Sequence, residues 1–141
     1  MFLGEYNHTI DDKGRLTIPA KYRADLAAGV VITRGFDQNL IAFPVNEWET
    51  LAQRIMARPL ADQDVREFRR RLFSGAVDLM PDRQGRILLP PYLREFAGIN
   101  GEVVIAGMYN YMEIWSTTAW EGVRENIENN HDVARWDDLG I

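Results

Sequence analysis

The stretch DDKGRLTIP at residues 11–19 returns as DRQGRILLP at residues 82–90, 71 positions later. An internal repeat fixes the architecture of a chain, because duplicated segments occupy equivalent environments in the fold. Beyond this core the match continues with a shift of one residue, so that VVITRGFDQNLIAFPVNEW at 30–48 aligns with EVVIAGMYNYMEIWSTTAW at 102–120. The sequence therefore predicts two copies of one structural unit.

The units are small, about 45 residues each, and this limits how they can fold. We place the first at residues 5–48 and the second at 76–120, with a helical linker at 49–75 between them. A C-terminal helix and an acidic tail follow at 121–141. Because a unit of this size buries too little apolar surface to be stable alone, we expect the two units to share one core.

Hydrophobic patterning predicts a β-rich α+β fold with the same elements in both units. The β-branched runs VVITRG and EVVIAG each end in glycine and precede a second short apolar run, which predicts one hairpin per unit. The run Asp-Asp-Lys-Gly at 11–14 predicts a further tight hairpin, with Gly14 at positive φ. Proline before and glycine after predict short helices at 20–28 and 91–98.

Apolar residues at helical spacing predict three longer helices. One closes each unit, and the apolar positions of these two are Trp48, Leu51, Ile55, Trp120, Val123 and Ile127. The third occupies 61–73 in the linker and carries the run FRRRLF. Its charged residues stand three or four positions apart and are expected to form ion pairs on a solvated face, with phosphate binding as the alternative. They are Asp62, Asp64, Arg66, Glu67, Arg70 and Arg71.

The net charge of −5 argues against nucleic acid as a partner, because DNA binding needs cations that displace counterions. The charges are unevenly distributed, however. Residues 1–75 hold 11 basic and 10 acidic side chains, whereas residues 76–141 hold 5 basic and 11 acidic ones. The segment 13–23 contains no acid and four cations, which are Lys13, Arg15, Lys21 and Arg23. We therefore expect an anion-binding surface on the first unit.

Several classes of protein are disfavoured by what the sequence lacks. The sequence has no cysteine, which excludes disulfides and thiolate chemistry. With only two histidines it also has too few of the usual ligands for a zinc site. It contains no P-loop, serine-hydrolase or HExxH signature, no long apolar run and no signal peptide. We expect a cytoplasmic protein that is not an enzyme and that binds no metal, cofactor, membrane or small-molecule substrate.

The duplicated Asp-x-x-Gly-Arg motif is the strongest candidate for function. An arginine beside a projecting turn can enter the major groove of DNA and donate two hydrogen bonds to guanine. In the first copy we assign base contact to Arg15, its orientation to Asp11 and the turn to Gly14. The residues assigned to flanking phosphates are Lys13, Lys21 and Arg23. The alternative is a structural turn that is held together by its own Asp–Arg pair.

The second copy keeps the motif with fewer cations around it. Two basic positions of the first copy are replaced by Gln84 and Tyr92, although Arg83 is gained. The candidate residues of this copy are Arg83 and Arg86 as DNA contacts, and Asp82 and Gly85 as structural residues of the motif. We expect DNA contact to fall mainly on the first copy, with the Asp82–Arg86 pair inside the shared core.

The opening GEYNHTIDDKGRLTIPAKYR, the second DRQGRILLP and the EIW…W ending closely resemble the MraZ family of bacterial transcriptional regulators, from residue 1 to about 130. The resemblance implies two SpoVT/AbrB-type swapped-hairpin units, packed as a pseudo-dimer within one chain, and several chains assembled into a ring. It also implies binding to guanine-rich direct repeats in the promoter upstream of its own gene, in the division and cell-wall gene cluster. The recognition element of the family corresponds here to Asp11, Gly14, Arg15, Asp82, Gly85 and Arg86.

From this resemblance we expect a homo-oligomeric repressor that binds double-stranded DNA in the cytoplasm, at the nucleoid. Ring assembly would compensate for the acidic composition, because linked binding sites gain avidity. One alternative is an antitoxin-like module whose ligand is a protein docked on the tail at 121–141. Another is a structural ring whose contact with DNA is incidental, and a small enzyme is a third.

Overall fold

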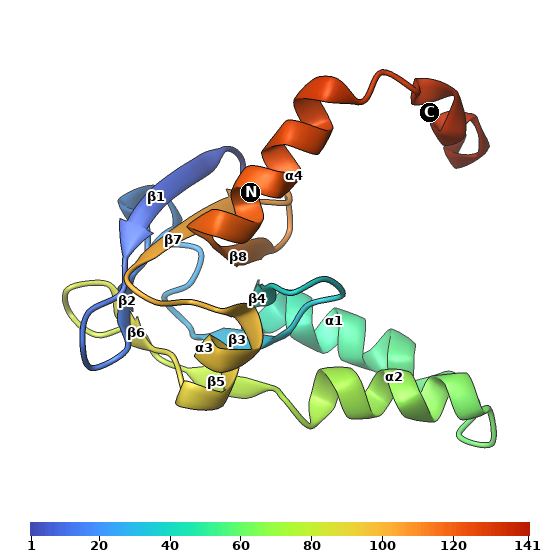
Figure 1. The fold of residues 1–141 in the computed structure, drawn as a ribbon. Coiled ribbons are helices and arrows are strands. Elements are labelled where there is room, and N and C mark those ends of the chain that lie inside the picture. Colours follow the sequence, from blue (N-terminus) through green and yellow to red (C-terminus); the bar gives the residue numbers. More distant parts are fainter.

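The computed structural model describes all of residues 1–141. It contains a six-stranded sheet, a separate two-stranded ribbon and helices packed around them (Figure 1). The strands are β1 (Glu5–Thr9), β2 (Arg15–Thr17), β3 (Val30–Arg34), β4 (Leu40–Pro44), β5 (Val77–Leu79), β6 (Arg86–Leu88), β7 (Glu102–Gly107) and β8 (Met112–Ser116). The helices are α1 (Val45–Met56), α2 (Gln63–Phe73), α3 (Pro91–Ala97) and α4 (Thr117–Asn129), with 3₁₀ helices η1 (Ala20–Tyr22) and η2 (Val133–Leu139).

The two repeats exchange strands with each other. The sheet has the order β1-β7-β8-β4-β3-β5, and all its pairs are antiparallel. The predicted hairpins β3–β4 and β7–β8 are present, but the first strand of each repeat pairs with the hairpin of the other, β1 with β7 and β5 with β3. The ribbon likewise joins one strand from each repeat, β2 and β6.

This exchange corrects the expectation of a tight hairpin at residues 11–14. The turn is present, but the strands on either side of it belong to different sheets, because β1 pairs with β7 and β2 pairs with β6. The only β-bridge between the two sides of the turn is the isolated one between Ile10 and Leu16. Each strand obtains its partner from the other repeat, which local sequence patterns cannot reveal.

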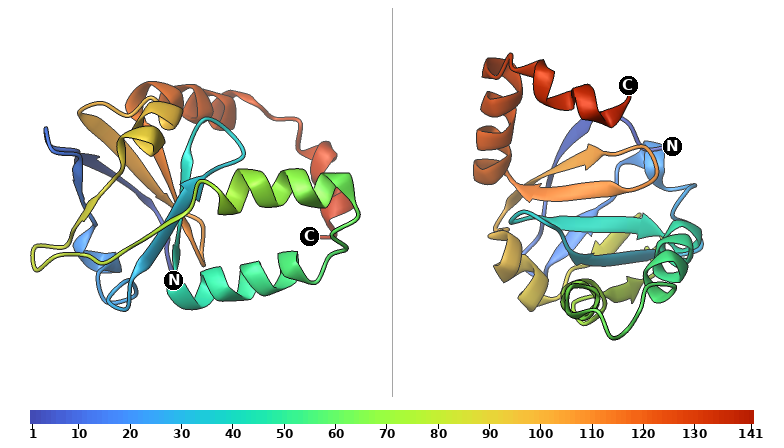
Figure 2. Two further views of the ribbon diagram at one scale, coloured as in Figure 1. Left: turned by 90° about the horizontal axis from the view of Figure 1, so that it is seen from below. Right: turned by 90° about the vertical axis from the view of Figure 1, so that its right-hand side faces the viewer.

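One core is shared by both repeats, as their small size predicts. Its 19 buried residues include Leu16 and Tyr22 from the first repeat and Ile87 and Leu93 from the second. This core fills the space between one face of the sheet and a layer formed by the ribbon, η1 and α3. The opposite face is covered by α1 and α2 over β3 and β4, and by α4 over β7 and β8 (Figures 1 and 2).

The helix predicted at 20–28 is shorter in the structure. Only Ala20–Tyr22 forms a 3₁₀ helix, and the turns that follow are closed mainly by bonds over three residues, such as Gly29 N–H to the Leu26 carbonyl at 3.0 Å. Its counterpart α3 is a true α-helix that ends at Gly98, whose φ of 63° gives a left-handed cap. Gly29 adopts a φ of 126° instead, so the first copy lacks this cap.

The three longer helices lie where the apolar spacing predicts them, as α1, α2 and α4. The expected ion pairs on α2 are absent, because its arginines donate to backbone carbonyls instead. Arg71 donates through Nε and Nη2 to Gly35, and Arg66 donates to Ala61 at 2.9 Å. These bonds tie α2 to the loop after β3 and to its own N-terminal turn.

Residues 131–141 form no hydrogen bond or ion pair with the sheet or with the helices that cover it. Every residue from 131 to 141 is exposed, and η2 stands away from the body at the end of α4 (Figures 1 and 2). The structure thus shows the tail undocked from the rest of the chain. No helix of the structure combines the length and apolarity needed to cross a membrane.

Replacing Leu16 by alanine is expected to lower the free energy of unfolding by about 2–5 kcal/mol, because this ribbon side chain is fully buried. Leu88 on the paired strand is 55% exposed, so Leu88→Ala should change stability by less than about 0.5 kcal/mol. Urea unfolding followed by circular dichroism compares the two variants. Equal losses would show that the ribbon does not face the shared core as described.

Candidate nucleic-acid interface

The first motif is a turn built around the carboxylate of Asp11. Oδ1 of Asp11 accepts the backbone N–H groups of Lys13 at 3.0 Å and of Arg15 at 2.8 Å, and Oδ2 accepts Nε–H of Arg15 at 2.6 Å. Gly14 donates its N–H to the Asp11 carbonyl at 2.9 Å and has a φ of 86°, which favours glycine. The spacing of Asp, Gly and Arg thus follows from the hydrogen bonds that close the turn.

The second motif repeats this arrangement. Oδ1 of Asp82 accepts the backbone N–H groups of Gln84 and Arg86, both at 2.9 Å, and Oδ2 accepts Nε–H of Arg86 at 2.9 Å. Gly85 has a φ of 74°. The prediction that the Asp82–Arg86 pair lies inside the shared core is wrong, because the side chains of Arg86 and Asp82 are 28% and 40% exposed.

Each turn is anchored on the other repeat. The Gly14 carbonyl accepts the N–H of Leu89 at 2.9 Å, and the Gly85 carbonyl accepts the N–H of Ile18 at 2.8 Å. These bonds extend the β2–β6 ribbon at both ends. Consequently the position of one arginine relative to the other is set by backbone hydrogen bonds rather than by flexible loops.

Two further arginines lie against the turn glycines, again across the repeats. The guanidinium of Arg94 lies so close to Gly14 that a Cβ there would be 3.0 Å from its central carbon, and Arg23 lies against Gly85 in the same way. Nε of Arg23 donates to the Ile18 carbonyl at 3.2 Å. The positive φ at both turns favours glycine, and the missing side chain leaves room for these guanidinium groups.

The two motif arginines share one face of the ribbon. In the β2–β6 pairing Arg15 lies opposite Leu88, and Thr17 lies opposite Arg86, so all four side chains point to the same side. Leu16 and Ile87, between them, point into the core. Arg15 and Arg86 are diagonal neighbours, a relation that separates side chains by about 7–8 Å.

Both arginines present unused donors on this face. Each uses Nε to bind its aspartate, and neither terminal nitrogen of Arg15 or Arg86 donates to another group of the chain. A guanidinium bound only through Nε keeps a planar set of terminal N–H donors free, and such donors match the O6 and N7 acceptors of guanine. The arrangement suits recognition of a base edge or a phosphate.

The electrostatics of the turns favour charged aspartates. The backbone N–H of Arg15 is the main cause that holds the pKa of Asp11 below its usual value, with the side chain of Arg15 contributing as well. The pKa of Asp82 is lowered for the same reasons by Arg86. Both carboxylates therefore stay ionised across the neutral pH range and keep the arginines oriented.

The structure brings most predicted contact residues to this end of the molecule, left in Figure 1. Lys13 and Arg83 are exposed on the two turns that carry Arg15 and Arg86. Lys21 is exposed on η1. Arg23 lies against Gly85 in the turn of the second repeat and not beside the turn of the first repeat, to which it belongs in sequence.

Three residues of this surface were not singled out from the sequence. Thr17 and Leu88 lie beside the arginines on the outer face, and the alternation of side chains in RLT and RIL could have indicated them. Arg94 is the repeat equivalent of Arg23 and packs on Gly14. Its contact with the first turn depends on the exchange between repeats, for which the sequence gives no local signal.

Comparison with known proteins agrees with the duplicated architecture. The model of the family described as "MraZ protein, putative antitoxin-like" matches the chain twice, over residues 1–71 and 72–138. The chain belongs to the MraZ family.

Relatives in this family are similar along most of their length, and each is named "Transcriptional regulator MraZ". The protein of Herpetosiphon aurantiacus is 54% identical over 90% of this chain and 89% of its own. Those of Roseiflexus castenholzii and Syntrophomonas wolfei are 53% and 44% identical, over 92% and 100% of this chain and 91% and 100% of their own. A solved structure, the solution structure of PHS018 from Pyrococcus horikoshii, aligns with a TM-score of only 0.34 at 15% identity, covering 81% of this chain and 88% of that one.

Replacing Arg15 by alanine is expected to leave the pKa of Asp11 below its ordinary 3.8, because the largest cause is the backbone N–H of residue 15, which alanine retains. A carboxyl group whose pKa is lower in the folded than in the unfolded protein stabilises the fold at pH values above its unfolded-state pKa. This stabilisation is lost as the pH falls through the folded-state pKa. Carboxyl chemical shifts measured by NMR across an acid titration would give both pKa values. An ordinary pKa in the variant would instead assign the effect to the guanidinium.

Gly85→Ala is expected to destabilise the protein more than Gly98→Ala, although both glycines have positive φ. The strain of φ, about 1–2 kcal/mol, is common to both variants. A Cβ at 85 would also lie 2.3 Å from Nε of Arg23 and displace its hydrogen bond, which adds about 0.5–1.5 kcal/mol, whereas a Cβ at 98 meets nothing. Urea unfolding measures the difference, and it should disappear when both changes are made in an Arg23→Ala background.

Proposed function

We propose that this chain is a DNA-binding transcriptional regulator that reads guanine in the major groove with the outer face of its β2–β6 ribbon. The observation that carries the proposal is the placement of Arg15 and Arg86 on one face, each oriented by its aspartate and each with free terminal donors. The name carried by the relatives of the MraZ family supports the same function.

The dimensions of the ribbon suit the major groove. This groove is about 12 Å wide and admits a two-stranded antiparallel ribbon. Successive bases along a strand are about 3.4 Å apart, so arginines separated by about 7–8 Å reach bases roughly two steps apart. Thr17 and Leu88 on the same face can contact the methyl group of thymine between or beside them.

The surrounding cations position the ribbon on the duplex. We assign phosphate contacts to Lys13, Lys21 and Arg83, which are exposed, and to the terminal nitrogens of Arg23. Phosphate contacts fix the register of a protein on DNA without specifying sequence. The second motif is included on equal terms with the first, because its aspartate, glycine and arginine have the same geometry.

The wider biological proposal follows the family. The exchange of strands supports a SpoVT/AbrB-type swapped-hairpin fold with units at 5–48 and 76–120. We propose that several chains form a ring, bind guanine-rich direct repeats in the promoter of their own gene, and repress the division and cell-wall genes in the cytoplasm, at the nucleoid. One chain of net charge −5 has few cations for tight binding, so affinity would depend on linking several ribbons.

The family description also supports a second candidate, an antitoxin-like module that binds a protein partner. The exposed segment 131–141 is the part of the chain that favours this reading. Purification of the chain with its associated proteins from its own cells would separate the candidates, since the regulator proposal requires DNA and no stoichiometric protein partner.

Arg15→Ala and Arg86→Ala are each expected to weaken binding to a duplex from the chain's own upstream region by about 1–3 kcal/mol per engaged site. Preference for guanine at the contacted position should relax at the same time. Fluorescence anisotropy with this duplex, and with one whose repeat guanines are replaced by adenine, measures both effects at stated salt.

Lys21→Ala serves as the matched control, because a phosphate contact should weaken both duplexes alike and lower the salt dependence of log K by about 0.9. If the Arg15 variant binds the guanine duplex as tightly as the unmodified protein, base contact by Arg15 is disproved.

A further inference from the structure

The C-terminal tail exposes an unusual amount of apolar surface. Trp136 is 47% exposed and Leu139 is 64% exposed, and Val133 and Ile141 are exposed beside them. The guanidinium of Arg135 lies 5.2 Å from the ring centre of Trp136. Large apolar side chains that gather on one exposed segment are typical of a surface that binds a partner.

The helix that carries the tail separates it from the rest of the fold. Trp120 and Val123 anchor the first half of α4 on the sheet, whereas residues 124–129 are all exposed. The helix of 13 residues is about 20 Å long, so the tail is presented away from the sheet (Figure 1). Trp136 and Leu139 do not belong to any of the three hydrophobic clusters of the fold.

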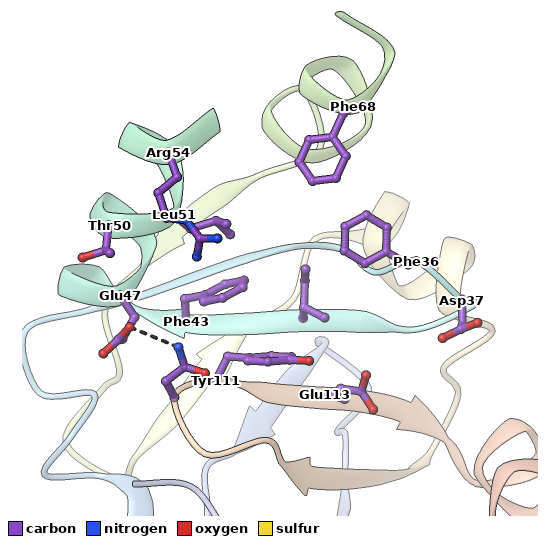
Figure 3. Close-up of a pocket in the computed structure, with 12 residues that line it drawn as sticks. Phe36, Asp37, Phe43, Glu47, Thr50, Leu51, Arg54, Phe68, Tyr111 and Glu113 are labelled. Carbon is purple, nitrogen blue, oxygen red and sulfur yellow. Dashed lines mark hydrogen bonds between the residues drawn. The ribbon is translucent and has the colours of Figure 1, made fainter. Parts of the chain in front are cut away.

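A groove on the helical face of the sheet offers a matching apolar surface (Figure 3). It has a volume of about 270 Å³ and lies between α1, α2 and the strands β4 and β8. Phe43 and Tyr111 stack at its base with ring centres 5.2 Å apart, and Phe36 and Phe68 stack at its rim at 5.5 Å. Phe36 is 60% exposed, which shows that the rim is not covered within this chain.

The charges of the groove complement those of the tail. Asp37 and Glu113 lie along the sheet side of the groove, and Arg54 reaches toward it from α1 (Figure 3). Glu47 is also on α1, where it accepts a hydrogen bond from the side chain of Asn110 at 3.3 Å. Leu51, Arg54 and Phe68 also line an adjoining groove between α1 and α2. The charged residues that this second groove adds are Arg58, Asp62 and Asp64.

The tail has one cation followed by two acids, in the order Arg135, Asp137, Asp138. Arg135 can therefore meet the carboxylates at the sheet side, while the two acids meet Arg54 and Arg58. Of the acids in the adjoining groove, Asp62 is already engaged, since its side chain accepts the N–H of Asp64 at the start of α2.

We propose that the tail of one copy docks in this groove of a second copy, with Trp136 and Leu139 on the phenylalanine and tyrosine rings. The interface is head-to-tail, because it joins the tail of one copy to the groove of the next, and these are two different surfaces. Such an interface closes into a ring or continues as a filament, depending on the angle between neighbours. The interface leaves the β2–β6 ribbon uncovered.

The test uses two full-length variants, Trp136→Glu in the tail and Phe68→Glu in the groove, and sedimentation measures their mass without DNA. The unmodified protein should form a large assembly, and each variant alone should fall to the 16.2 kDa monomer. An equimolar mixture of the two variants should form dimers of twice that mass and nothing larger, because it contains one intact tail and one intact groove per pair.

Met80→Glu is the matched control, since Met80 is exposed, apolar and outside the groove, and this variant should assemble like the unmodified protein. Circular dichroism and thermal unfolding confirm that each variant is folded. A monomeric unmodified protein, an assembly that survives either variant, or a mixture that stays monomeric would overturn the proposal. The readout is mass alone, so it is independent of whether the ribbon binds DNA.

Discussion

The fold depends on the exchange of strands and turns between the two repeats. Each turn ends in a glycine carbonyl that accepts an N–H from the other repeat, Gly14 from Leu89 and Gly85 from Ile18. The ribbon, the edges of the six-stranded sheet and the shared core all follow from this reciprocal pairing. Neither repeat has a complete sheet or core without the other, which is why duplication within one chain is sufficient for a stable unit.

The same exchange links stability to the candidate interface. The turns that hold Arg15 and Arg86 are built from backbone bonds across the repeats, and the arginines behind them, Arg23 and Arg94, fill the space that the glycines leave. A contact surface fixed in this way needs little ordering when it binds a ligand. The aspartates complete the arrangement, because their ionised form both closes the turns and directs the guanidinium groups outward.

Much of this organisation is predictable from the sequence, and the failures share one cause. The repeat, the hairpins from VVITRG and EVVIAG and the linker helix predicted at 61–73 depend on local patterns, and these predictions are confirmed. The pairing of β1 with β7 joins residues far apart in the sequence, so local patterns predict a simple hairpin at 11–14 where the structure has none. The contact of Arg23 with Gly85 is non-local in the same way. On α2 the sequence offers acids to the arginines, but backbone carbonyls such as that of Gly35 lie closer in space.

The two strands of the β2–β6 ribbon are nearly symmetric, but the two turns beside it carry different residues. The outer surface of the ribbon is therefore asymmetric. Lys13 stands on one turn where Gln84 stands on the other, and Arg83 has Asp12 as its counterpart. A symmetric dimer of identical chains presents the same groups twice and so matches inverted sequences. A single chain with unlike halves presents an asymmetric surface. Successive copies bound along a polymer can therefore all have the same orientation.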